Sequence, residues 1–345
     1  MNGTRPVSKA TAERVREAFS ALDYQPNPAA RVLRGLPAER IGLIVANSAS
    51  PFWSAAIKGV EQVAYEMGYN LLLCDSDEDP AKEITNFKML SGEKVDGIIF
   101  APTSQANAQA IRDLNIRIPL VQIARKLESV PVDSVTCDNL SGGFKATKHL
   151  IALGHRRIAC ISSNLTVSPG HDRLTGYKIA IEESGSEVNP NLILEVSLGP
   201  EGGYEAAQNL LRGNPPDAIF ACNHLQAFGI LQALRERQIR VPEDLALIAY
   251  DDMPWSPFID PPLTVVRQPI AYMAGEAARL LISRLEERFR HRHSNRQPLM
   301  HQQRVVGIEL VDRTSCGLPE RHRSLPVFDA AVDRTGPQHY TSLED

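Results

Sequence analysis

Several polar and aromatic side chains directly follow apolar runs that are predicted to be buried strands. They are Phe52, Trp53, Asp75, Asn223 and Asp251. Planar polar groups that form paired hydrogen bonds, together with an aromatic face, are what hold a sugar or another polyol. This chemistry is binding rather than bond breaking, and it predicts a site for a small hydroxylated molecule.

Structural roles compete with each of these assignments. Trp53 is equally well explained by core packing. For Asp251 the capping of a turn is the alternative, but a ligand role is favoured. Asp75 and its neighbour Asp77 are better explained as loop residues or helix caps than as ligands. The alternatives stay open at the level of the sequence.

Motifs that would indicate catalysis or metal binding are missing. The chain has no Gly-x-Ser-x-Gly, no Gly-x-Gly-x-x-Gly and no His-x-x-x-His on a predicted helix. Its five cysteines are scattered and form no Cys-x-x-Cys pair. We therefore expect no enzyme activity, no metal and no cofactor.

The elements that position the candidate ligands alternate between strands and helices. A first series is predicted at 41–45, 54–68, 69–73, 80–91, 97–101, 106–114 and 119–123. A second series is predicted at 141–153, 158–161, 170–184, 192–196, 202–212, 218–221, 224–237 and 245–250. Two such series predict an α/β fold with two Rossmann-like lobes of parallel sheet flanked by helices. Ligands of open sheets bind beyond the carboxyl ends of the strands, so we expect the site between the lobes.

The end of the chain adds a long amphipathic helix at 270–290 and one late strand at 304–310. Residues 317–345 are polar and without period, and we expect them to be disordered. No apolar run approaches the roughly 20 residues of a membrane span, and the N-terminus lacks a secretory pattern. We expect a cytoplasmic protein without membrane contact.

The first forty residues differ in charge and pattern from the remainder. They carry seven basic and four acidic groups, whereas the rest of the chain is net negative. Ser8 is predicted to cap a helix whose Val15, Ala18 and Phe19 face a partner. A basic end on an acidic body suits a contact with nucleic acid.

Several segments in order along residues 2–315 resemble the lactose- and purine-repressor family, the LacI/GalR regulators. They include Ser50-Pro51-Phe52-Trp53, His149-Leu150-Ile151-Ala152-Leu153-Gly154-His155, and Tyr250-Asp251-Asp252 followed by Pro261-Pro262-Leu263-Thr264. The resemblance implies a periplasmic-binding-protein type I fold, preceded by a helical DNA-binding headpiece. It also implies a transcriptional regulator, most simply a repressor, whose operator affinity is controlled by a sugar-like effector.

The resemblance also assigns the DNA contacts. Asn2, Thr4, Arg5 and Asn27 match the loop and third helix of the family headpiece, and Arg31, Leu33 and Arg34 match its hinge helix. Leu33 would wedge into the minor groove, or would only pack the linker against the first lobe. The printed chain begins after the family's recognition helix, so we expect weak operator binding or none.

Within the effector domain the resemblance adds Arg173 and Arg125 to the candidate ligands. Arg173 stands where the family places an effector-binding arginine, although an ion pair with Asp172 or Glu182 is the structural alternative. The family often has Asp-Arg at 124–125 and Asn-Asp at 223–224, whereas this chain has Ala124 and His224. We therefore expect the effector either to carry fewer hydroxyl groups or to be acidic. His224 is read more safely as a helix start than as a ligand.

The family pattern gives the domain boundaries and the partners. Residues 1–26 form a partial headpiece and 27–38 the hinge and linker. The first lobe spans 39–139 with about 270–296, and the second spans 140–267 with about 300–315. We expect a homodimer. The alternative is a sugar-binding protein of the same fold without DNA-binding activity.

Overall fold

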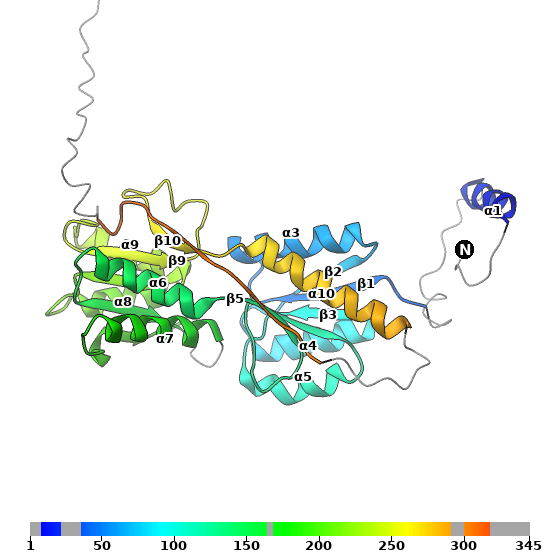
Figure 1. Ribbon diagram of the computed structural model, residues 1–345, viewed down its shortest axis with the longest axis horizontal. Helices are drawn as coiled ribbons and strands as arrows, with labels where there is room; N and C mark the ends of the chain where they lie inside the picture. Colours follow the sequence, from blue (N-terminus) through cyan, green and yellow to red (C-terminus); the bar gives the residue numbers. More distant parts are fainter. Residues whose placement is uncertain (1–7, 22–35, 164–167, 291–299, 318–345) are drawn as a thin grey trace, which may run out of the picture.

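The computed structural model describes residues 8–21, 36–163, 168–290 and 300–317. These form two α/β lobes side by side, with helix α1 (Lys9–Ala21) apart from them (Figure 1). All seven predicted DNA contacts, from Asn2 to Leu33 and Arg34, lie outside the described residues. The expected disorder of the tail beyond residue 317 lies outside them as well.

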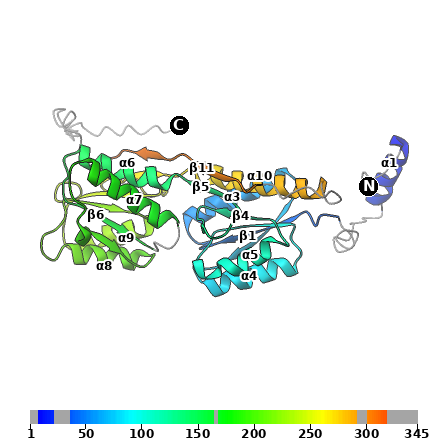
Figure 2. The ribbon, with the colours of Figure 1, turned by 60° about the horizontal axis from the view of Figure 1, so that its bottom comes forward.

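The first lobe is built on a six-stranded parallel sheet in the order β11-β5-β4-β3-β1-β2. Its strands are β1 (Arg40–Val45), β2 (Asn70–Asp75), β3 (Gly97–Phe100), β4 (Leu120–Ile123), β5 (Asp133–Cys137) and β11 (Gln303–Val306). Its helices are α3 (Pro51–Glu66), α4 (Pro80–Gly92), α5 (Ala108–Asn115) and α10 (Ile270–Arg290), with the short 3-10 turn η1 (Gln105–Asn107) before α5. Helix α10 lies alongside α3 (Figure 2).

The second lobe repeats this plan with the order β12-β10-β9-β8-β6-β7. Its strands are β6 (Ile158–Ser162), β7 (Ile193–Glu195), β8 (Ala218–Ala221), β9 (Ala246–Tyr250), β10 (Thr264–Arg267) and β12 (Glu309–Val311), the last antiparallel to β10. Its helices are α6 (Asn139–Ala152), α7 (Ser168–Glu183), α8 (Pro200–Leu210) and α9 (His224–Glu236), with the turn η2 (Pro190–Leu192) before β7.

Apolar side chains cover both faces of each sheet, which is why the strands read as continuous apolar runs. One face of the first sheet packs Leu43 and Ile99 against α3 and α10, and the other packs Ile44 and Phe100. The second sheet is covered in the same way on both faces. The core therefore consists of four layers that hold the strand ends in place.

The prediction of a single strand at 304–310 is wrong. The segment forms two strands, β11 and β12, separated by Gly307 and Ile308. Strand β11 pairs with β5 of the first sheet, and β12 pairs with β10 of the second. Residues 303–306 therefore belong to the first lobe, although we expected all of 300–315 in the second. The break explains this, because Gly307 and Ile308 lie outside both strands and carry the chain from the first sheet to the second.

Ser8 caps α1 as predicted, with its Oγ accepting a hydrogen bond from the Thr11 N–H at 3.2 Å. No helix among the described residues is long and apolar enough to cross a membrane.

Candidate functional site

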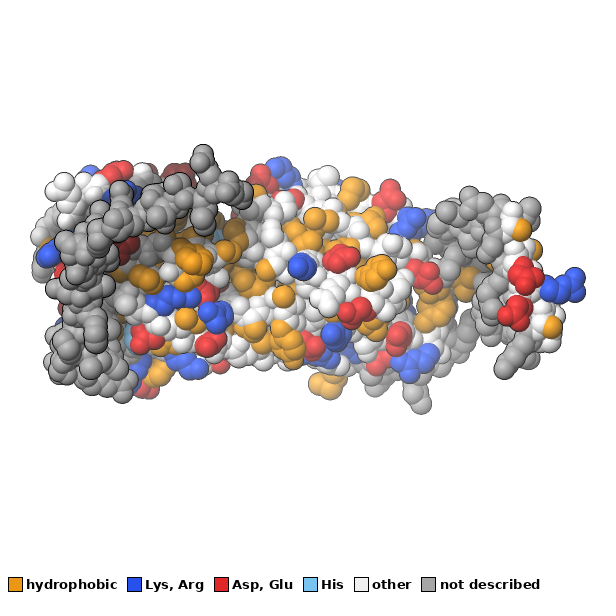
Figure 3. Space-filling view, turned by 90° about the horizontal axis from the view of Figure 1, so that it is seen from above, with side chains coloured by type: hydrophobic (Ala, Val, Ile, Leu, Met, Phe, Trp, Pro, Cys, Tyr) orange, Lys and Arg blue, Asp and Glu red, His pale blue; other side chains and the backbone are white. Residues whose placement is uncertain are grey.

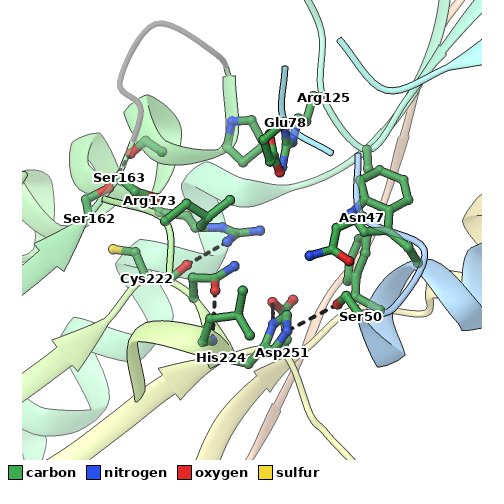
Figure 4. Close-up of a pocket in the computed structure, with 18 of the residues that line it drawn as sticks. Asn47, Ser50, Glu78, Arg125, Ser162, Ser163, Arg173, Cys222, His224 and Asp251 are labelled. Carbon is green, nitrogen blue, oxygen red and sulfur yellow. Dashed lines mark hydrogen bonds and ion pairs between the residues drawn. The ribbon is translucent and has the colours of Figure 1, made fainter. Parts of the chain in front are cut away.

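A cavity of about 420 Å³ lies between the two lobes, where the carboxyl ends of both sets of strands meet. Each lobe supplies side chains from the loops that follow its strands. Asn47 comes after β1 and Glu78 after β2, while Ser162 ends β6 and Asp251 follows β9. The close-up in Figure 4 shows these side chains converging on one space. Its position is the one that parallel strand topology predicts for a ligand.

Arg173 enters the cavity from α7 and is 7% exposed. Its Nε donates to Asn139 Oδ1 at 2.9 Å, and its Nη1 donates to the Cys222 carbonyl at 2.6 Å. The guanidinium lies 3.5 Å from the centre of the Tyr250 ring, within cation–π range. The alternative of a surface ion pair with Asp172 or Glu182 is therefore wrong.

Glycines at the contact between α6 and α7 fix the position of Arg173. A Cβ on Gly143 would lie 2.1 Å from the Arg173 carbonyl oxygen, and one on Gly176 would lie 2.1 Å from the Leu140 carbonyl oxygen. The backbones thus touch without side chains between them. This contact sets how far Arg173 reaches into the cavity.

A buried hydrogen-bonded chain joins the two lobes on the other side of the cavity. Asp251 Oδ2 accepts from His224 Nδ1 at 2.9 Å, and His224 Nε2 faces Ser50 Oγ at 3.4 Å (Figure 4). Asp251 Oδ1 accepts from Gln268 Nε2 at 2.6 Å. Burial opposes ionisation, but His224 and Arg173 outweigh it and hold the pKa of Asp251 below its ordinary value.

The first lobe contributes an ion pair and two rings. Arg125 donates from Nη1 and Nη2 to the two carboxylate oxygens of Glu78, at 2.7 and 2.6 Å. Its guanidinium lies 5.9 Å from the Trp53 ring centre. Phe52 and Trp53 meet edge to face with centroids 5.0 Å apart. Both rings belong to the core and also line the cavity, so neither earlier reading of Trp53 excludes the other.

The structure brings six of the seven candidate effector ligands to the cavity. They are Phe52, Trp53, Arg125, Arg173, Asn223 and Asp251. Asp75 lies outside the cavity, and its carboxylate accepts from the backbone N–H groups of Ser48 and Asp77 at 2.7 and 2.8 Å. That is the loop role that the sequence favoured. The binding roles of the other six stay a prediction.

Further lining residues were not singled out from the sequence. Ser50, Glu78 and Gln268 are examples, and each follows a strand as a polar residue, the signal that could have found them. His224 begins α9, as the safer reading had it, and also lines the cavity. Within the described ranges, no group of three or more His, Cys, Asp or Glu side chains is placed to hold a metal ion.

Comparison with known proteins agrees with this geometry. A family model described as a periplasmic binding protein-like domain matches residues 147–316. The regulator DegA of Bacillus subtilis is 36% identical over 282 residues, covering 81% of this chain and 84% of DegA. The repressor PurR of Haemophilus influenzae strain PittEE is 35% identical over 288 residues, covering 83% of this chain and 85% of PurR.

Solved structures give the same result. The transcriptional regulator CelR in complex with cellobiose is 30% identical, with a TM-score of 0.72, over 91% of this chain and 93% of that one. The chain belongs to the LacI family of transcriptional regulators.

Proposed function

We propose that this chain is a cytoplasmic transcriptional regulator whose affinity for operator DNA is set by a small molecule bound between the lobes. The observation that supports it most is the cavity itself, which is lined from both lobes and holds a buried arginine. A ligand that contacts both lobes binds the closed arrangement better than an open one. It therefore shifts the population between the two states by that difference in affinity.

The proposed effector is a carbohydrate or carbohydrate derivative. Phe52 and Trp53 offer aromatic surface, while Arg173 and Asn223 offer planar polar groups. CelR, similar to this chain over most of its length, is described in complex with cellobiose. Binding measurements with candidate carbohydrates would identify the effector and give its affinity.

We propose a homodimer as the acting form. Large apolar side chains are exposed on helices of both lobes, with Tyr65 79%, Phe228 55% and Tyr272 62% exposed. Figure 3 shows hydrophobic side chains interspersed with charged ones on the face seen from above. Exposed apolar patches of this kind serve as protein interfaces. Analytical ultracentrifugation should give twice the chain mass of 38.0 kDa, whereas a species at the chain mass would reject the dimer.

The test of function combines ligand and DNA binding. A thermal-shift panel of sugars, sugar acids, polyols and purines is run on the parent, Arg173→Ala and Asp251→Ala. A ligand of the native state raises the Tm by mass action. We expect one compound to stabilise the parent and neither variant. Equal stabilisation of both variants would reject the cavity as its site.

DNA binding is then measured by fluorescence anisotropy on operator candidates, with and without that compound. We expect weak binding by the printed chain that changes when the compound is added. Binding that stays the same would reject effector control. Because operator binding by this chain is expected to be weak or absent, absence of DNA binding does not by itself favour the alternative, a sugar-binding protein of the same fold.

Three residues of the cavity bear on the expectation that the protein is not an enzyme. Ser50, His224 and Asp251 stand in the order of a hydrolase triad, with Ser50 Oγ 3.4 Å from His224 Nε2 and His224 Nδ1 2.9 Å from Asp251 Oδ2. We propose that the hydrogen bonds among Ser50, His224 and Asp251 link the two lobes and that Ser50 does not act as a nucleophile. Hydrolysis of p-nitrophenyl acetate should then be equal for the parent and Ser50→Ala. A rate that depends on Ser50 would overturn this.

A further inference from the structure

The carboxylates that line the cavity already accept hydrogen bonds from the protein. Both oxygens of Glu78 are held by Arg125, and both oxygens of Asp251 are held by His224 and Gln268. A neutral sugar presents many hydroxyl donors, and carboxylates are the strongest acceptors for them. In this cavity each of these carboxylate oxygens already accepts one hydrogen bond, which leaves fewer lone pairs for the hydroxyl groups of a ligand.

The side-chain amides are occupied in the same sense. Asn223 Oδ1 accepts from the Leu225 N–H at 2.8 Å as the cap of α9, and Asn47 Oδ1 accepts from the Ala49 N–H at 3.0 Å. The Nδ2 amide nitrogens of both residues have no protein acceptor in the described part of the chain, so they are available to donate to a ligand. Figure 4 shows the amide nitrogen of Asn47 pointing across the cavity toward Arg173. The lining therefore offers hydrogen-bond donors in excess.

Arg173 adds a buried positive charge to these donors. Its hydrogen bonds go to the neutral groups of Asn139 and Cys222, and it forms no ion pair with any described residue. Nη2 is the guanidinium nitrogen left to face the cavity. The buried Asp251 carboxylate acts on Arg173 through space without forming an ion pair with it. Nη2 therefore keeps a donor that an anion would satisfy better than a neutral acceptor.

Helix orientation adds partial positive charge to a lining whose formal charges balance, with Arg125 and Arg173 against Glu78 and Asp251. Helices α3, α7 and α9 all begin at residues that line the cavity or next to them, namely Pro51, Ser168 and His224. The N-terminus of a helix carries partial positive charge and stabilises anions within its first turn. Three such ends and Arg173 act on one space of about 420 Å³.

From this excess of donors we infer that the effector is a sugar acid, whose carboxylate is bound by Arg173 Nη2 and Asn223 Nδ2. The inference rests on the proposed function and narrows its ligand class from carbohydrates in general to hydroxylated carboxylic acids. Its hydroxyl groups would lie toward the first lobe, against Asn47 and the rings of Phe52 and Trp53. A neutral sugar of the same shape would offer Arg173 Nη2 only hydroxyl oxygens, which are weaker acceptors than a carboxylate.

The experiment compares matched pairs of ligands by isothermal titration calorimetry on the full chain. The pairs are glucuronate with glucose, galacturonate with galactose, and gluconate with glucitol. We expect at least one acid to bind at least about tenfold more tightly than its neutral partner, as loss of a charged hydrogen bond implies. If a neutral member binds as tightly as its acid or more tightly, the inference is wrong and the proposed function stands. If no member binds, the inference is rejected, and the wider thermal-shift panel decides whether the effector is a carbohydrate.

Asn223→Asp tests the named contact with minimal change in shape. The variant keeps an oxygen to cap α9 but replaces the free donor with a negatively charged acceptor. We expect at least about tenfold weaker binding of the acid and a change within about threefold for the neutral partner. Asn189→Asp is the matched control, because Asn189 Oδ1 likewise accepts from the backbone N–H two residues on, at 3.0 Å, outside the cavity. Unchanged acid affinity in a folded Asn223→Asp would overturn the inference.

Discussion

The contact between α6 and α7 predicts that Gly143→Ala disturbs the ligand site without touching it. The new Cβ would lie 2.1 Å from the carbonyl oxygen of Arg173 and 2.8 Å from its carbonyl carbon. Because ordinary contacts are longer and the blocking atoms are backbone, α7 has to move by about 1 Å or more. Overpacking of this kind costs about 1–3 kcal/mol of unfolding free energy. Arg173 moves with the backbone that carries it.

Two measurements on the same variant check this reasoning. Urea unfolding should show the loss of stability, and calorimetry should show at least about tenfold weaker binding of the tightest ligand of the parent. Gly92→Ala is the control, since a Cβ at Gly92 meets nothing within 4 Å and should leave both quantities nearly unchanged. If Gly143→Ala unfolds at the parent's urea concentration and binds equally well, the close contact does not position Arg173.

Three further predictions follow from buried groups. Asp133→Ala removes the carboxylate that accepts from Arg284 at 2.7 and 2.9 Å, while Glu287 and the Met300 carbonyl remain as partners of Arg284. It should lower the free energy of unfolding in urea titrations by about 1–3 kcal/mol, and an unchanged value would contradict a stabilising role of this pair. The pKa of Asp251 is below its ordinary value of about 3.9, so its ionisation stabilises the fold above that pH and is lost as pH falls through the lower folded value. The gap in Tm between the parent and Asp251→Asn should therefore narrow below about pH 4, and a gap constant from pH 7 to 2 would contradict the shift. All five cysteines are buried, so iodoacetamide should label none in the native protein and all after unfolding, as counted by mass spectrometry; rapid native labelling would show that a thiol is accessible.

Much of the fold could be predicted because the signal was local. The long apolar periods of α3 and α10, and the fully buried runs of β1 and β9, are visible as patterns in the sequence. Strands β5 and β10 were not predicted as elements, because Asp133, Ser134 and Thr136 make β5 look polar although it is buried. The split into β11 and β12 was missed because pairing partners lie far away in the chain.

The site was predictable in position and less so in its chemistry. Strand ends identified Asn223 and Asp251, and the family pattern identified Arg173. Sequence alone did not show that the oxygens of Asp251 are taken by His224 and Gln268, because those contacts bring together segments from different strands. Which donors and acceptors remain for a ligand is a tertiary property.

The chain passes between the lobes three times, after β5, after β10 and between β11 and β12. In each sheet these passages meet neighbouring strands, β5 with β11 and β10 with β12, so they lie along one edge of the molecule. Three tethers in a row resist twisting and sliding but bend together, which leaves one easy motion, a rotation about that edge. A single backbone cut in any tether leaves two others intact. Neither lobe can therefore be released by one protease cleavage or obtained as one continuous gene fragment.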